Sequence, residues 1–83
     1  MIHIDSAQTL GNTLKLSRKQ LGLNQAQLAL AAGVGVRFIV ELEAGKPTLR
    51  LEQVLRVIDA LGGELMLGGW QGSSSDEVQQ HGA

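Results

Sequence analysis

The sequence predicts an all-α domain, a compact bundle of four to five short helices, followed by one short β-strand that pairs across a dimer. Apolar residues recur at the spacing of one helix face in several stretches of the chain. Glycines follow these stretches and supply the left-handed backbone conformation that ends a helix. Because Phe38 and Trp70 are the only aromatic residues among 83, the core has to be built from Leu, Val, Ile and Ala.

The first helix is expected to begin after Ser6 and to stop at Gly22. Serine caps helix N-termini through its side-chain oxygen, and glycine tolerates the positive φ of the residue after a helix. The predicted inner face of this helix, with spacings i, i+4, i+7 and i+11, consists of Leu10, Leu14, Ser17 and Leu21.

Two shorter helices are expected next. Asn24 is the predicted cap of the second helix, whose sequence QAQLALAA ends at Gly33. The third helix is expected from about Val36 to Ala44, and Gly45 stops it. Pro47 prevents its continuation because proline has no backbone N–H to donate.

The last predicted helix spans Leu51 to Leu61 and ends at the Gly62-Gly63 pair. It has the most regular apolar periodicity in the chain. The inward stripe predicted for it consists of Leu51, Val54, Leu55, Ile58 and Leu61.

A short β-strand is predicted at Glu64–Leu67, between two Gly-Gly pairs that leave too few residues for a helix. A lone strand needs a partner to satisfy its backbone groups. The expected partner is the same strand of a second subunit, with Ile2–Ile4 as a poorer candidate. The predicted dimerisation residues are Glu64, Leu65, Met66 and Leu67.

The chain is expected to form one small domain with short extensions. Residues 1–5 form an N-terminal arm, residues 6–62 the helical domain, and residues 63–70 the dimerisation strand. Residues 71–83, with the sequence QGSSSDEVQQHGA, have the small, polar and acidic composition of a flexible tail.

Composition argues against several classes of function. The chain has no cysteine and two histidines near opposite ends, and it lacks paired carboxylates, a nucleophile beside a base, or a phosphate-binding loop. An enzyme is therefore not expected, nor a cofactor, a metal or a small-molecule ligand. No apolar run approaches the roughly 20 residues of a membrane helix, and the N-terminus lacks the order of a secretory signal. A cytoplasmic protein with no membrane partner is expected.

The charges are unevenly distributed along the chain. Residues 11–56 contain all seven Lys and Arg residues and three Glu, a net charge of +4. The remaining residues contain five acids and no Lys or Arg. This asymmetry indicates a middle segment that faces a polyanion.

Residues 25–43 have the pattern of a helix-turn-helix motif, two short helices joined by a tight turn that contains glycine. Any compact helical hairpin can have one of these features. All of them together, followed by the sequence EAGK, favour the helix-turn-helix. The small or apolar residues that it requires are Leu28, Ala29, Gly33, Val34, Ile39 and Leu42.

The stretches LGLNQAQLALAAGV and FIVELEAGK closely resemble the Xre/Cro family, helix-turn-helix proteins that include the lambdoid phage repressors. The resemblance covers roughly residues 10–62. It implies a lambda-repressor-like bundle of about five helices and dimeric binding to a palindromic operator in double-stranded DNA. It also implies an internal salt bridge between Arg18 and Glu43, so that these residues stabilise the fold and do not contact the DNA.

The same resemblance implies which residues face the DNA. Gln25 opens the first helix of the motif, and in the family its side chain reaches a phosphate or the first base. Asn24 is interpreted as a helix cap rather than a contact. The residues that the second helix of the motif would present to the major groove are Gly35, Val36, Arg37, Phe38, Val40 and Glu41.

Arg37 is the strongest candidate for base readout, because arginine can bond guanine O6 and N7 together. Its alternatives are a phosphate contact and a solvated surface charge. Phe38 either touches a thymine methyl group or closes the core beside Ile39. Glu41 either accepts a hydrogen bond from cytosine N4 or pairs with Lys46. Because base readout is sparse, specificity is expected to depend on DNA shape and on phosphate contacts, for which the candidates are Lys15, Lys19, Lys46 and Arg50.

The sequence LEQVLRVIDALGG followed by ELML is similar to the ending of HipB-type antitoxins, in which a C-terminal strand pairs across the dimer. This similarity implies a HipA-like kinase toxin as partner and repression of the shared operon. A stand-alone Xre regulator and a protein-interaction module without DNA binding are the alternatives.

Trp70 stands alone between a Gly-Gly pair and the acidic tail. It either folds back onto its own dimer or anchors a protein partner, since tryptophan is enriched at the energetically dominant positions of interfaces. In the second case the tail would order on binding.

Overall fold

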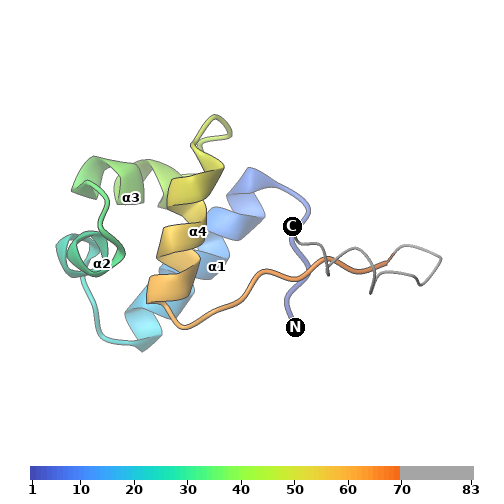
Figure 1. The fold of residues 1–83 in the computed structure, drawn as a ribbon, viewed down its shortest axis with the longest axis horizontal. Helices are drawn as coiled ribbons and strands as arrows, with labels where there is room; N and C mark the ends of the chain where they lie inside the picture. The colour runs from blue at the N-terminus through green and yellow to red at the C-terminus, as the bar shows by residue number, and fades with distance from the viewer. Residues whose placement is uncertain (70–83) are drawn as a thin grey trace.

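The computed structural model describes residues 1–69, and within them it contains four α-helices and no β-strand (Figure 1). The all-α prediction is confirmed, with four helices. Their bounds are α1, Ala7–Gln20; α2, Gln25–Ala32; α3, Val36–Glu43; and α4, Leu51–Ala60.

The helix ends follow the capping chemistry of the sequence. The Ser6 hydroxyl accepts a hydrogen bond from the Thr9 amide at 3.0 Å. Asn24 and Gln27 form a capping box in which each side chain accepts from the other residue's backbone N–H at 2.8 Å. Gly33 has φ 73°, the left-handed conformation expected of the residue that ends α2. α3 ends one residue before the predicted Ala44.

Helices α2 and α3 form the predicted helix-turn-helix. Residues 33–35 join them, and the chain direction changes by 113° between the two helices, within the range of the motif. α4 packs against α2, and α1 packs against α3. The motif is therefore held between the two longer helices.

Apolar side chains from all four helices form one core, in which Ile39 and Val57 are fully buried. The buried residues are Leu14, Leu28, Ala29, Ala32, Ile39, Leu42, Val54, Val57 and Ile58. No aromatic side chain belongs to this set, and Phe38 packs against it from the edge.

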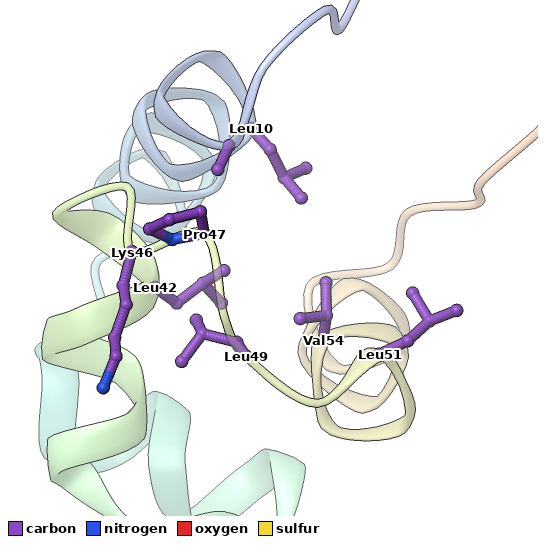
Figure 2. Close-up of a pocket in the computed structure, with 8 residues that line it drawn as sticks. Leu10, Leu42, Lys46, Pro47, Leu49, Leu51 and Val54 are labelled. Atoms are coloured by element: carbon purple, nitrogen blue, oxygen red, sulfur yellow. The ribbon is translucent and has the colours of Figure 1, made fainter.

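The predicted stripe of α4 is wrong at two positions. Leu51 is 64% exposed and Leu55 is 40% exposed, whereas Val57, which was not predicted, has no exposed surface. Val54, Val57 and Ile58 follow the i, i+3, i+4 pattern of the true inner face. Leu51 lies beside a shallow apolar hollow of about 140 Å³ between α1, α4 and the loop that joins α3 to α4 (Figure 2).

The predicted inner face of α1 is also wrong at its C-terminal end. Leu21 is 55% exposed because it lies after the helix, at the C-cap, and the face contains the buried Arg18 instead. Gly11, also buried, lets α1 approach the last turn of α3, where a Cβ atom would overlap the Leu42 carbonyl oxygen. This close contact lets α3 pack tightly against α1.

Residues 64–69 leave the bundle as a segment without regular structure, on the side away from α2 and α3 (Figure 1). Leu65, Met66 and Leu67 are 54–77% exposed. The predicted strand at Glu64–Leu67 requires a second subunit, so it stays a prediction. Trp70 and the proposed tail, residues 71–83, lie outside the described residues.

Among residues 1–69, no single helix is long and apolar enough to cross a membrane. Helices α2 and α3, which are bent at 113° to each other, have the length and apolar composition of such a helix only when taken together.

Candidate DNA interface

The outer face of α3, which consists of Gly35, Val36, Arg37, Val40 and Glu41, is the side of the motif turned away from the core. Val36 and Val40 are about 45% exposed, and the Arg37 side chain is 89% exposed. The turn places Gly35 at the N-cap of α3. Five of the six residues predicted to face the major groove therefore lie on one surface.

Phe38 is the exception among the residues predicted on α3. It is half-buried and packs against the core, next in sequence to the fully buried Ile39. The helical turn of about 100° per residue sends position 38 inward when positions 37 and 41 point outward. Of the two roles open to Phe38, the structure favours closing the core.

Glu41 bridges two cations on the outer face of α3. Its Oε2 atom lies 3.3 Å from Arg37 Nε, and its Oε1 atom lies 3.4 Å from Lys46 Nζ. The Lys46 side chain runs along α3, with its ammonium group directed away from the leucines of the hollow (Figure 2). The pairing of Glu41 with Lys46 was one of the two predicted alternatives. The pairing with Arg37 was missed, although their i, i+4 spacing is the standard signal for it.

Arg18 and Glu43 form the internal salt bridge that the family resemblance implied. Arg18 donates to both carboxylate oxygens of Glu43, at 2.7 and 3.0 Å, and its third contact is the Leu23 carbonyl at 2.8 Å. The two side chains are 9% and 4% exposed. The network links α1 to the end of α3 and to the loop before α2.

Gln25, predicted to contact DNA, is joined to this network. Its amide donates to Glu43 Oε1 at 3.1 Å. The side chain that opens α2 is thus positioned by the same carboxylate that closes α3. Neither spacing nor charge pattern predicted this bond.

Burial alone would raise the pKa of Glu43, but hydrogen bonds from Arg18 and Gln25 and the positive charges of Arg18 and Lys15 lower it below its ordinary value of 4.5. The hydrogen bond to Glu43 raises the pKa of Arg18 despite its burial. Both groups are consequently charged at neutral pH, and the ion pair persists.

The other predicted phosphate contacts, Lys15, Lys19 and Arg50, are all exposed. Lys15 and Lys19 lie on α1, and Arg50 is the N-cap of α4. Residues 1–69 contain no cluster of His, Cys, Asp or Glu arranged to hold a metal ion. The outer face of α3, which bears Arg37 and has Lys46 beside it, is suited to a polyanionic groove.

The comparisons with known proteins agree with this geometry. The model of the HTH_3 helix-turn-helix family matches residues 14–66. An uncharacterized HTH-type transcriptional regulator of Sinorhizobium fredii, y4mF, is 48% identical over 59 residues, which cover 71% of this chain and 78% of the relative.

Solved structures of HipB have the same fold. HipB in a HipA–HipB–O2–O3 complex superimposes with a TM-score of 0.78 at 25% identity, over 86% of this chain and all of that one. HipB in an O4 20mer complex superimposes with a TM-score of 0.77, also at 25% identity and with the same coverage. Together with the helix-turn-helix geometry, these matches show that the chain belongs to the HTH_3 helix-turn-helix family and is a DNA-binding transcriptional regulator.

Proposed function

We propose that the chain is a dimeric repressor that binds a palindromic operator and inserts α3 of each subunit into the major groove. The observation that carries this proposal is the outer face of α3, a single exposed surface on a helix held at 113° to its partner. The fold shared with HipB in DNA complexes supports it. Two recognition helices of a dimer would lie about 34–36 Å apart, one turn of DNA.

Dimer formation through residues 64–67 is part of this proposal. It is supported by three consecutive large apolar side chains, Leu65, Met66 and Leu67, that are exposed in the single chain. Pairing with a second copy would cover them and satisfy their backbone groups. The segment leaves the bundle away from α3 (Figure 1), so a dimer formed there leaves the outer face of α3 open.

The finer proposal is that the repressor is the antitoxin of a HipBA-like toxin–antitoxin module, with a HipA-like kinase toxin as partner and autoregulation of the operon. Support comes from the structural match, over 86% of this chain, to HipB in a complex with HipA. The proposed working compartment is the cytoplasm, where operator and toxin meet. Trp70 is the proposed anchor for the toxin.

A stand-alone transcriptional regulator is the second candidate. It is favoured by the 48% identical relative, which is named only as an HTH-type transcriptional regulator. The neighbouring reading frame discriminates the two functions. A kinase-like protein of several hundred residues supports the antitoxin, and its absence supports the stand-alone regulator.

DNA binding is tested by a fluorescence-anisotropy titration with a duplex from the region upstream of the gene. A scrambled duplex of the same composition is the control, and both are measured at two salt concentrations. We expect tight, salt-sensitive binding with a clear preference for the upstream duplex. No binding to either duplex at low salt would contradict the repressor and favour a protein-interaction module.

Arg37 is the proposed base-reading residue, and its substitution gives a specific prediction. Arg37→Ala should weaken operator binding by about 1–3 kcal/mol and relax the preference at one base pair. Arg56→Ala is the control, because Arg56 also pairs with a glutamate four residues away but lies on α4, and its contact with the motif is a long 3.5 Å hydrogen bond to the Gly33 carbonyl oxygen. An equal loss on operator and scrambled duplex would mean that Arg37 contacts phosphate instead.

A further inference from the structure

Glu41 lies on the outer face of α3 although it carries the same charge as DNA. A carboxylate in this position is repelled by the phosphates. It adds to affinity directly only where it can accept a hydrogen bond from cytosine N4. Its two ion pairs point to a different role.

Both carboxylate oxygens of Glu41 are engaged by cations of the interface. The side chain is 28% exposed, less than that of Arg37 at 89% or Lys46 at 45%. A partly buried carboxylate is screened less by salt than an exposed one. Glu41 carries one negative charge, so it offsets about half of the positive charge that Arg37 and Lys46 would present to DNA while the protein is free.

The contact with Arg37 is made through Nε. This leaves the two Nη groups at the end of the guanidinium as the donors that reach outward from the helix. Two donors in a fixed plane are what a guanine edge requires at O6 and N7. The ion pair can thus remain in place while Arg37 reads a base.

A second i, i+4 pair in the molecule shows what is particular to Glu41. Glu52 and Arg56 on α4 are also 3.3 Å apart, but the Glu52 side chain is 74% exposed and has one cation partner among the described residues. An exposed pair of this kind contributes little to stability. Glu41 differs in its burial and in holding a second cation from outside its own helix.

We propose that Glu41 is a specificity-determining residue. Its ion pairs with Arg37 and Lys46 favour the contacts of these cations with the operator over their contacts with the phosphates of DNA of any sequence. This inference rests on the proposed function of α3 in DNA binding. On scrambled DNA, Glu41 cancels attraction that the two cations would otherwise supply. On the operator, it orients the Nη groups of Arg37 toward a guanine and limits the freedom that binding would have to remove.

The test is Glu41→Gln, measured by anisotropy on the upstream duplex and on its scrambled form between about 50 and 200 mM salt. Each freed cation adds about 0.9 to the salt slope, which is about 3-fold in affinity over that range. Because Glu41→Gln removes one negative charge, we expect scrambled-duplex affinity at 50 mM salt to rise at least about 3-fold and its salt slope to steepen by about 1. Operator affinity should change by less than about 3-fold, so that discrimination falls.

Glu52→Gln is the matched control, because it removes the same charge from a pair of the same spacing on α4. We expect it to leave the affinity for each duplex within about 2-fold. A rise in scrambled-duplex affinity for Glu41→Gln no greater than that for Glu52→Gln would overturn the proposal, since the effect would then be one of net charge.

The double substitution Arg37→Gln with Lys46→Gln provides the second control. In that background, adding Glu41→Gln should raise scrambled-duplex affinity no more than Glu52→Gln does, and it should leave discrimination unchanged. An effect that persists there would mean that Glu41 acts on DNA directly, as cytosine readout would. If the unsubstituted protein binds neither duplex, the repressor function itself fails. If it binds the operator and Glu41→Gln leaves discrimination between the two duplexes unchanged, only the present inference is overturned.

Discussion

Among residues 1–69, Arg18 and Glu43 are the two charged residues whose side chains are buried. Removing both charges from water is costly, and two hydrogen bonds of 2.7 and 3.0 Å offset part of this cost. The pair also positions neighbouring segments, because Arg18 donates to the Leu23 carbonyl and Glu43 accepts from the Gln25 amide. The pair fixes where α2 begins relative to the end of α3, and so fixes the motif that meets DNA.

The lowered pKa of Glu43 predicts an acid-sensitive fold. A carboxylate with a lowered pKa stabilises the folded state above its ordinary pKa of 4.5, and the stabilisation is lost as pH falls through the lower, folded value. The free energy of unfolding should therefore decline below about pH 4.5, because Arg18 stays charged and loses its partner. Urea denaturation at pH 7, 4 and 3 measures this decline.

The variant Glu43→Gln separates this effect from general acid denaturation. It should be less stable by about 3 kcal/mol at pH 7, since Arg18 is left as a buried charge without an anion. Its stability should also depend less on pH between 4.5 and 3 than that of the unsubstituted protein. Glu52→Gln, at an exposed pair, should keep the full pH dependence. An identical decline in all three proteins would show that Glu43 is not the group responsible.

The sequence predicted some of these residue contacts and not others, for physical reasons. The Arg18–Glu43 pair was predictable from the family resemblance, although 25 positions separate the residues. The Arg37–Glu41 pair was predictable from spacing alone and was overlooked. The bond from Gln25 to Glu43 could not be predicted, because it depends on the meeting of two helix ends that periodicity does not place.

At the scale of elements, the contact between α1 and α3 depends on Gly11. A glycine inside a helix normally costs about 1 kcal/mol relative to alanine. Here a Cβ atom would overlap the Leu42 carbonyl oxygen and would lie 3.1 Å from the Glu43 carbonyl oxygen. Both neighbours are backbone atoms and cannot rotate away. The clash of an added Cβ atom should therefore cost more than the gain in helix propensity from glycine to alanine.

Gly11→Ala should consequently destabilise the protein, in contrast to most glycine-to-alanine changes in helices. We expect a loss of about 1–3 kcal/mol in the free energy of unfolding, the cost of overpacking a tight contact. Gly35→Ala is the control, because Gly35 has φ −77° and open space around its Cβ position. It should change stability by less than about 1 kcal/mol. Chemical denaturation that finds Gly11→Ala neutral or stabilising would refute the close contact.

The helices themselves were largely predictable from capping residues and periodicity, and their inner faces were not. Ser6, Asn24 and Gly33 mark helix ends through local chemistry, which a sequence displays directly. Which leucines of α4 are buried depends on what packs against them. Leu51 and Leu55 are apolar and correctly spaced, but the helices of residues 1–69 leave them 64% and 40% exposed.

At the scale of the whole molecule, the chain is small for an independent domain. A chain of this length buries only about 60–65% of its extended surface, and this one has no cysteine to add a disulfide. Association with a second copy is a common remedy. The exposed apolar segment at residues 65–67 and the exposed leucines of α4 are surfaces that association would cover.

Only alternate N–H groups of a strand face its partner, so at least one of the two variants Leu65→Pro and Met66→Pro is predicted to weaken the dimer. Proline has no backbone N–H and is excluded from a paired strand away from its edge. If residues 64–67 pair across two subunits, the dissociation constant measured by sedimentation equilibrium should rise at least about 10-fold. Because folding and association are coupled by mass action, the melting temperature of the weakened variant should also depend less on protein concentration over the range where the unsubstituted protein dimerises.

Met66→Val is the matched control for Met66→Pro. Valine is apolar, keeps its backbone N–H and favours strands, so the dimer should persist with a similar dissociation constant. Loss of the dimer in both variants would assign the effect to the Met66 side chain rather than to strand pairing. If the Leu65→Pro and Met66→Pro proteins both remain dimeric at low micromolar concentration, residues 64–67 do not form the interface. The dimer would then have to use another apolar surface, such as the hollow that Leu51 lines.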